Sequence, residues 1–196
     1  TLPSFSKDKS ANFKALKIPI SSVIAGCVVR SEKLNNIDFW RLLKRLLDDC
    51  PRLHFVLAAQ SLPDIARQYL GTSLFTEKFH HLGWVNTKEW CQYLDIYLDS
   101  FPRGSCLTAL EAVKARVPIV MFDSKHNRES SALPYLMSAG GGKLPLGVFN
   151  SENLSTSYDQ IKLIMCNKDE RLRIASQQFK LLRSLEGMGP LYSKDY

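Results

Sequence analysis

The stretch from residue 95 to residue 123 most constrains how this chain can fold. Residues 96–99 form a short apolar run, and residues 101–104 (Phe-Pro-Arg-Gly) have turn chemistry, because proline fixes its own φ and glycine tolerates positive φ. Residues 108–116 repeat apolar side chains at helical spacing, and a second apolar run follows at 119–122. This order predicts a strand, a turn, a helix and a second strand, which is one β-α-β unit.

The start of the predicted helix is a candidate anion site. Ser105 is a good N-cap candidate, and the free N–H groups and positive dipole end of a helix start attract phosphate. Glu111 lies three residues after Thr108, so both side chains are expected on one helix face. This arrangement suits a ligand that carries phosphates at one end and a hydroxyl pair nearby.

The rest of the chain alternates apolar runs with amphipathic segments. The further apolar runs are residues 23–29, 54–59, 79–82 and 146–149, and helical spacing is expected over 37–47, 62–70, 88–94, 128–138, 151–166 and 169–185. Such alternation predicts the α/β class: a Rossmann-like parallel sheet of about six strands with helices on both faces. Residues 1–22, polar and basic, are expected to be a linker or interdomain segment, and residues 23–196 a single domain.

The net charge and the cysteine positions limit the classes of partner, the compartment and the kinds of site that the sequence predicts. A net charge of +7 indicates an anionic partner, but Lys and Arg are spread along the chain rather than clustered with aromatic residues, so nucleic acid ranks low. No apolar run approaches the ~20 residues of a membrane span.

The five cysteines include no CxxC pair, which argues against a disulfide framework or a zinc site and favours a reducing, cytoplasmic compartment. His80 and His81 are adjacent in a predicted strand and cannot share a metal, so no metal site is expected.

Four short motifs resemble the C-terminal, nucleotide-sugar-binding half of GT-B-fold glycosyltransferases. They are residues 83–85 (Gly-Trp-Val), 95–100 (Asp-Ile-Tyr-Leu-Asp-Ser), 104–112 (Gly-Ser-Cys-Leu-Thr-Ala-Leu-Glu-Ala) and 117–120 (Val-Pro-Ile-Val). The chain looks most like the O-GlcNAc transferase branch and its bacterial relatives. The resemblance implies metal-independent transfer of a hexosyl or N-acetylhexosaminyl group from a nucleoside diphosphate sugar, expected to be UDP-linked, to an acceptor protein or glycan. It also implies that a missing N-terminal domain holds most of the acceptor, so the isolated chain is expected to be inactive.

The resemblance also implies which residues bind the donor. The expected nucleotide-sugar ligands are Val85, Asn86, Gly104, Ser105, Cys106, Leu107, Thr108 and Glu111. Backbone amides at the helix start would hold the diphosphate, the carboxylate of Glu111 the ribose hydroxyls, and backbone groups of Val85 and Asn86 the base.

Two cations after the first predicted strand, Arg30 and Lys33, are the candidate catalytic residues. A diphosphate leaving group gains negative charge as the sugar bond breaks, and without a metal, cations and helix amides must stabilise that charge. Lys33 looks like the family's phosphate-contacting basic residue, and Arg30 falls beside it. Arg103 stands eight residues before Glu111, where many retaining members carry a second glutamate, so the stereochemistry of transfer stays open.

Two other functions fit the same features. A nucleotide-sugar epimerase half-domain would use the same donor site without an acceptor, and a non-catalytic nucleotide-binding module would help assemble a larger complex. Trp84 is expected either beside the nucleotide or in the core. Residues 126–128 (His-Asn-Arg) follow the fifth predicted strand and are expected to face the sugar or the acceptor. Cys106 is expected to be non-catalytic, since the sequence identifies no base for it.

Overall fold

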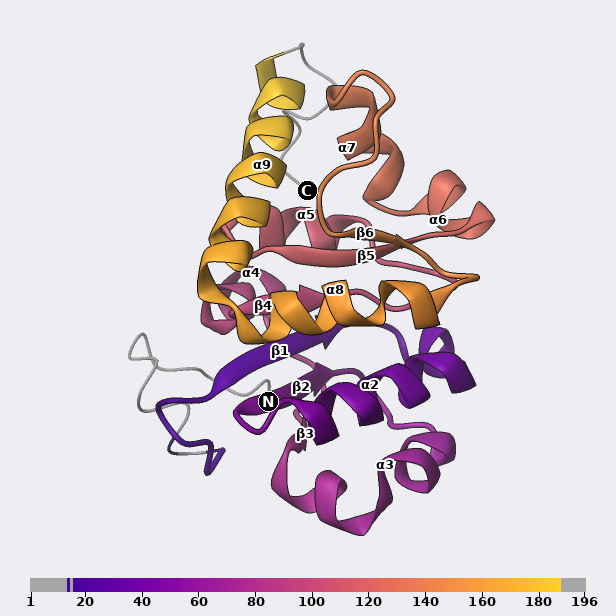
Figure 1. The fold of residues 1–196 in the computed structure, drawn as a ribbon, viewed down its shortest axis with the longest axis vertical. Helices are drawn as coiled ribbons and strands as arrows, with labels where there is room; N and C mark the ends of the chain where they lie inside the picture. Colours follow the sequence, from indigo (N-terminus) through magenta and orange to yellow (C-terminus); the bar gives the residue numbers. More distant parts are fainter. Residues whose placement is uncertain (1–13, 15, 188–196) are drawn as a thin grey trace.

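A parallel sheet organises the computed structural model, which describes residues 14 and 16–187 (Figure 1). Within these residues the sheet has six strands in the order β3-β2-β1-β4-β5-β6, and each neighbouring pair is parallel. The strands are β1 (Val23–Val28), β2 (Leu53–Ala58), β3 (Phe79–His81), β4 (Ile96–Leu98), β5 (Ile119–Asp123) and β6 (Val148–Asn150). The predicted α/β class and Rossmann-like sheet are confirmed.

The neighbouring interior strands β1 and β2 form the most continuous part of the core. Every residue of both strands is buried, including the one polar residue, His54, and the strands pair in register from Val23 with Leu53 to Val28 with Ala58. The strand order reverses beside β1, where β4 pairs on its other side. Parallel sheets bind ligands beyond the carboxyl ends of the strands at such a switch point. The candidate site is therefore expected between the ends of β1 and β4.

Helices cover both faces of the sheet. They are α2 (Ile37–Asp49), α3 (Asp64–Glu77), α4 (Thr87–Trp90), α5 (Leu107–Lys114), α6 (Lys125–Ser130), α7 (Leu133–Ala139), α8 (Leu154–Cys166) and α9 (Lys168–Gly187), with short 3-10 turns η1 (Ser31–Leu34) and η2 (Cys91–Tyr93). In Figure 1, α2, α3 and α8 lie in front of the sheet, and α4 and α5 lie behind it. This is the two-sided cover that alternating strands and helices predict.

The packing of α2 shows how sequence spacing becomes core. The Asn36 side chain caps the helix by accepting from the N–H groups of Asp38 and Phe39. Apolar residues at helical spacing then face the sheet, and Phe39 and Trp40 are fully buried. On its outer side, Asp49 accepts a 2.8 Å hydrogen bond from the Tyr158 hydroxyl, which holds α8 against α2.

Two predicted helices differ from the structure at their glycine and proline residues. The helix expected over 62–70 continues to Glu77 after an interruption at Gly71, whose φ of 71° and ψ of 167° lie outside the helical region. The helix expected over 128–138 divides into α6 and α7. Pro134 lies in the first turn of α7, where a missing N–H removes no helical hydrogen bond.

The segment before β1 lies mostly outside the described residues. In its described part, Ile18 is buried in the core. None of the described helices is both long enough and apolar enough to cross a bilayer.

Candidate functional site

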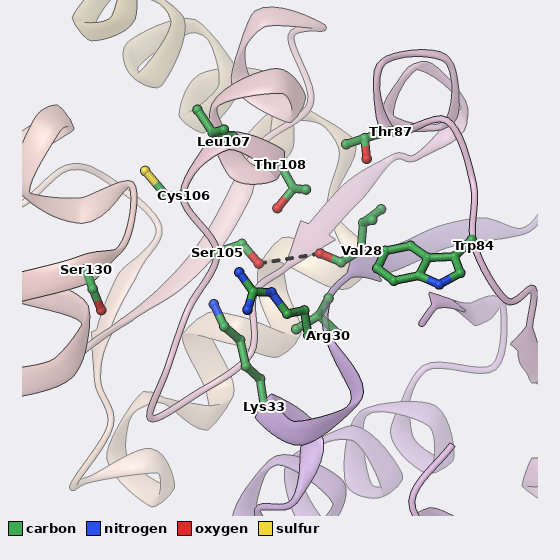
Figure 2. A pocket seen from close by; sticks show the side chains of 11 residues that line it. Val28, Arg30, Lys33, Trp84, Thr87, Ser105, Cys106, Leu107, Thr108 and Ser130 are labelled. Atoms are coloured by element: carbon green, nitrogen blue, oxygen red, sulfur yellow. Dashed lines mark hydrogen bonds between the residues drawn. The ribbon is translucent and has the colours of Figure 1, made fainter. Parts of the chain in front are cut away.

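A cavity of about 370 Å³ lies where β1 and β4 end and α5 begins (Figure 2). It is lined by Val28, Val29, Arg30, Lys33, Trp84, Thr87, Ser105, Cys106, Leu107, Thr108 and Ser130. These residues come mainly from the three segments that the sequence singles out, which follow β1, β3 and β4. The structure therefore brings the three loops together at the switch point of the sheet.

The predicted site residues divide into those that line this cavity and those that do not. The lining residues are Arg30, Lys33, Ser105, Cys106, Leu107 and Thr108. Val85 is buried and Asn86 exposed, and both lie between the lining residues Trp84 and Thr87. Gly104 is buried beside the cavity, and Glu111 is half-buried on α5, one turn beyond Thr108.

Lys33 connects two of the loops. Its ammonium donates a 2.6 Å hydrogen bond to the carbonyl oxygen of Gly104, so the segment after β1 is joined to the loop that leads into α5. An ammonium carries three N–H donors, which leaves two for a ligand. Figure 2 shows the side chains of Lys33 and Arg30 both extending toward the start of α5. A guanidinium nitrogen of Arg30 lies 3.8 Å from a carboxylate oxygen of Glu32. Both side chains are largely exposed, so this ion pair contributes little to stability.

The start of α5 differs from the prediction in its cap. The N-cap residue is Cys106 rather than Ser105, and no side chain caps the first-turn amides. Ser105 is buried, and its hydroxyl lies 3.2 Å from the Tyr97 hydroxyl. The expected capping role of Ser105 is wrong because a tertiary partner takes its hydroxyl. The first-turn N–H groups of α5 are thus left for an anion from outside the helix.

Tyr97, which the sequence did not single out, ties the walls of the cavity together. Its hydroxyl donates to the carbonyl oxygen of Val28 at 3.0 Å and lies 3.2 Å from the hydroxyls of Ser105 and Thr108. Burial raises the pKa of Tyr97 well above its ordinary value, so the phenol stays neutral and keeps its donor proton. The end of β1 and the start of α5 are therefore held at one fixed separation.

Asp99 holds the loop between β4 and α5. The fully buried carboxylate accepts from the N–H of Ser100 at 3.0 Å, and its two oxygens accept from the N–H of Ser105 at 2.9 and 3.0 Å. Burial raises the pKa of Asp99 to about 7, while these N–H groups and Lys33 act in the opposite direction. The one sequence signal for this role was that the short run at residues 96–99 ends on an acidic residue.

Asn127 holds the same loop from the other side. Its side-chain oxygen accepts from the N–H of Gly104, and its amide nitrogen donates to the carbonyl of Phe122 at 2.7 Å. A β-carbon at position 104 would overlap with the Asp99 carboxylate, so only glycine fits there. Asn127 is 1% exposed and holds the backbone instead of facing a ligand, and the neighbouring Arg128 pairs with Asp123. The expectation that Asn127 faces the sugar or the acceptor is wrong, whereas the same expectation for Arg128, whose side chain is 56% exposed, stays a prediction.

Cys106 and Trp84 also line the cavity, and their burial decides which role each side chain can take. Burial raises the pKa of the Cys106 thiol, with Lys33 acting the other way and Asp99 adding to the rise, so a thiolate is disfavoured. Trp84 is 47% exposed at the cavity rim, which places it outside the core. The indole is thus available to pack against a ligand.

Comparison with known proteins relates this architecture to one class of fold. No family model and no curated protein matches the chain. Among solved structures, the C-terminal domain of the glycosyl transferase group 1 family protein LpcC from Francisella tularensis matches with a TM-score of 0.62 and 16% identity, over 91% of this chain and 93% of that one. The chain has the fold of a GT-B glycosyltransferase C-terminal domain.

Longer glycosyltransferases match over only part of their length. A mutant O-GlcNAc transferase from Thermobaculum terrenum has a TM-score of 0.57 and 21% identity, over 95% of this chain and 36% of that one. A mutant of TarM from S. aureus, solved with fondaparinux, alpha-GlcNAc-glycerol and UDP, has a TM-score of 0.62 and 16% identity, over 86% of this chain and 35% of that one. The GT-B-like chain spans about a third of these two structures, and at such identities the likeness establishes the fold alone.

Proposed function

We propose that this chain is the donor-binding half of a metal-independent glycosyltransferase. It would bind a UDP-linked sugar and present a hexosyl or N-acetylhexosaminyl group to an acceptor protein or glycan. The observation that carries the proposal is the cavity at the switch point, where Lys33 lies beside an uncapped helix start in a GT-B-type domain. The presence of UDP in the TarM structure supports the choice of nucleotide.

The charges around the cavity suit a diphosphate leaving group. Lys33 keeps two N–H donors after its bond to Gly104, and Arg30 lines the same cavity. The first-turn amides of α5 add donors and the positive end of a dipole. These groups would stabilise the negative charge that grows on the diphosphate as the sugar bond breaks. In other enzymes a metal ion performs this task.

The nucleoside would extend away from the phosphates along α5. Glu111 lies one turn beyond Thr108 on α5, and its carboxylate is the group that we assign to the ribose hydroxyls. Val85 and Asn86 lie between the lining residues Trp84 and Thr87, and we assign the base to their backbone groups.

The acceptor and its base would come from a second half. Sugar transfer requires an acceptor placed on the far side of the donor sugar, with a group to take its proton. Since the chain spans about a third of the longer GT-B structures, we assign these parts to a preceding domain. This chain alone would bind nucleotide without transferring sugar.

Calorimetric titration with UDP, GDP and uridine tests the donor site. UDP is expected to bind with a dissociation constant between micromolar and millimolar, about −4 to −8 kcal/mol, and to raise the melting temperature of the chain. Uridine should bind more weakly, because it lacks the phosphates that Lys33 and α5 would hold. Absence of both heat and thermal shift with every nucleotide would contradict the proposal.

Replacing Glu111 with alanine is expected to weaken UDP binding by ~1.5–3 kcal/mol, because a carboxylate that accepts two ribose hydroxyl bonds is lost. The same titration measures it. The diphosphate of 2′-deoxyuridine should bind the wild-type chain more weakly than UDP, yet differ little from UDP in Glu111→Ala. Glu152→Ala, which removes an exposed carboxylate at the start of the α8 segment, is the matched control. Equal UDP affinity in all three proteins would show that Glu111 merely faces solvent.

A further inference from the structure

Two cysteines far apart in sequence lie close together at the amino ends of the strands, on the opposite side of the sheet from the candidate site at the carboxyl ends. The sulfur atoms of Cys50 and Cys166 lie 3.1 Å apart, although 116 positions separate the residues along the chain. Cys50 caps the end of α2, and Cys166 is the last residue of α8. Figure 1 shows both helices ending where β1 begins, at the amino edge of the sheet. This pair plays no part in the proposed nucleotide site.

The contact between α2 and α8 is held independently of the sulfur atoms. Asp49, next to Cys50, accepts from the Tyr158 hydroxyl at 2.8 Å and from the Lys162 ammonium at 3.2 Å. Both partners lie on α8, so the end of α2 is held against the middle of α8. A disulfide bond requires about 2.05 Å between sulfurs, so the two atoms need to approach by only about 1 Å.

The two thiols differ in their access to solvent. Cys166 is exposed, whereas Cys50 is buried. Burial and the neighbouring Cys166 thiol raise the pKa of Cys50 to about 12, so Cys50 stays protonated. An external reagent therefore meets Cys166 first, and Cys50 is placed to react second.

A basic cavity adjoins the exposed thiol. Its volume is about 430 Å³, and the charged residues that line it beside Cys166 are the cations Arg52, Arg116, Lys168 and Arg171 and one carboxylate, Asp95. The Arg171 guanidinium donates to the carbonyl oxygens of Ile164 at 3.3 Å and Met165 at 3.0 Å, which places this cation at the end of α8 next to Cys166. Four cations against one carboxylate leave the cavity with an excess of positive charge, which favours a reagent that carries carboxylates.

We propose that Cys50 and Cys166 are a modification site, which forms a reversible disulfide by exchange with a small anionic disulfide of the oxidised-glutathione type. The Cys166 thiolate attacks one sulfur of the reagent, forms a mixed disulfide and releases the first thiolate. Cys50 then gives up its proton to the thiolate released first and attacks the Cys166 sulfur of the mixed disulfide, which releases the second thiolate; that thiolate takes up the proton that Cys166 had lost to solvent. Two protein thiols are oxidised, one reagent disulfide is reduced to two thiols, and atoms and electrons balance.

The test incubates the fully reduced chain with oxidised glutathione, traps free thiols with an alkylating agent and maps the peptides by mass spectrometry. We expect a Cys50–Cys166 cross-link and two glutathione thiols released per chain. Cys50→Ala should instead accumulate a mixed disulfide on Cys166, because the second thiol is absent. Cys166→Ser, a substitution at an exposed position, should give neither product.

Cystamine, a small disulfide with two ammonium groups, tests whether the basic cavity selects the reagent. If exposure of the Cys166 thiol alone decides the rate, the charge of the disulfide should not matter. The cations around Cys166 should make it react several-fold more slowly than oxidised glutathione at low salt, and added salt should reduce the difference. The cross-linked chain should melt about 4–10 °C higher than the reduced one, since the bond closes a long loop, and dithiothreitol should reverse the shift.

Three results would overturn the inference. A wild-type chain that keeps a stable mixed disulfide on Cys166 would show that Cys50 does not act second. Equal rates with cystamine and oxidised glutathione would remove the basic cavity from the reaction. A cross-link that still forms in Cys166→Ser would place the chemistry at other cysteines.

Discussion

Replacing Lys33 with alanine is expected to lower the turnover of a UDP-sugar about 10²–10³-fold in a protein that carries both the donor half and an acceptor half. The Lys33 ammonium lines the cavity at the start of α5 and has two N–H donors beyond its bond to Gly104. The charge on a diphosphate leaving group grows toward the transition state, so the loss falls mainly on turnover. UDP affinity is expected to fall by less than about tenfold, or ~1.4 kcal/mol.

The controls separate catalysis from support of the loop. Lys180→Ala removes one exposed cation from α9 and should leave turnover unchanged. Because Lys33 also bonds the Gly104 carbonyl, the melting temperature and UDP affinity of Lys33→Ala should be measured alongside turnover. A variant that is folded, binds UDP and retains full turnover would remove Lys33 from the proposed mechanism.

Replacing Asp99 with alanine is expected to destabilise the domain by about 2–4 kcal/mol. The carboxylate is fully buried and accepts from the N–H groups of Ser100 and Ser105, which would be left without an acceptor inside the protein. Urea unfolding of the variant and the wild type measures the difference. Asp123→Ala, which removes a partly exposed carboxylate paired with Arg128, should cost less. Equal losses from the two substitutions would contradict the special role of the Asp99 site.

The same carboxylate is expected to make stability depend on pH. Its folded pKa of about 7 lies above the ordinary value of 3.8, so the folded state binds more protons than the unfolded state between these values. The Asp99 contribution is therefore most favourable below about pH 4 and is lost as pH rises toward 7, by up to roughly 4 kcal/mol.

Asp99→Asn should remove this dependence while retaining a side-chain acceptor for the loop. The measurement is the free energy of unfolding of both proteins from pH 4 to pH 8, with the variant subtracted to cancel other groups. A difference that grows in favour of the wild type as pH rises would show that the Asp99 pKa is lowered by its N–H partners rather than raised by burial.

The sequence alone was enough to determine the sheet and the place of the site. The segments that form β1 and β2 are almost entirely apolar because both of their faces are buried, and such segments can be recognised in a sequence without knowledge of any tertiary contact. The turn at 101–104, followed by a helix, placed a helix start at the carboxyl end of β4. Alternation of strands and helices then permits only a few topologies, which is why three loops could be expected to converge.

Tertiary structure decided how the site is held. Ser105 has the local preference of an N-cap, but its hydroxyl is taken by Tyr97, whose own partner at Val28 lies 69 positions away. Asp99 and Asn127 look like ordinary polar residues in the sequence. In the structure both are buried, and their side chains accept hydrogen bonds from the backbone of the loop between β4 and α5. Cys50 and Cys166 meet only because α2 and α8 pack together. Periodicity records which face of an element is buried, whereas the partner of a buried polar group depends on contacts between distant segments, which a local pattern does not contain.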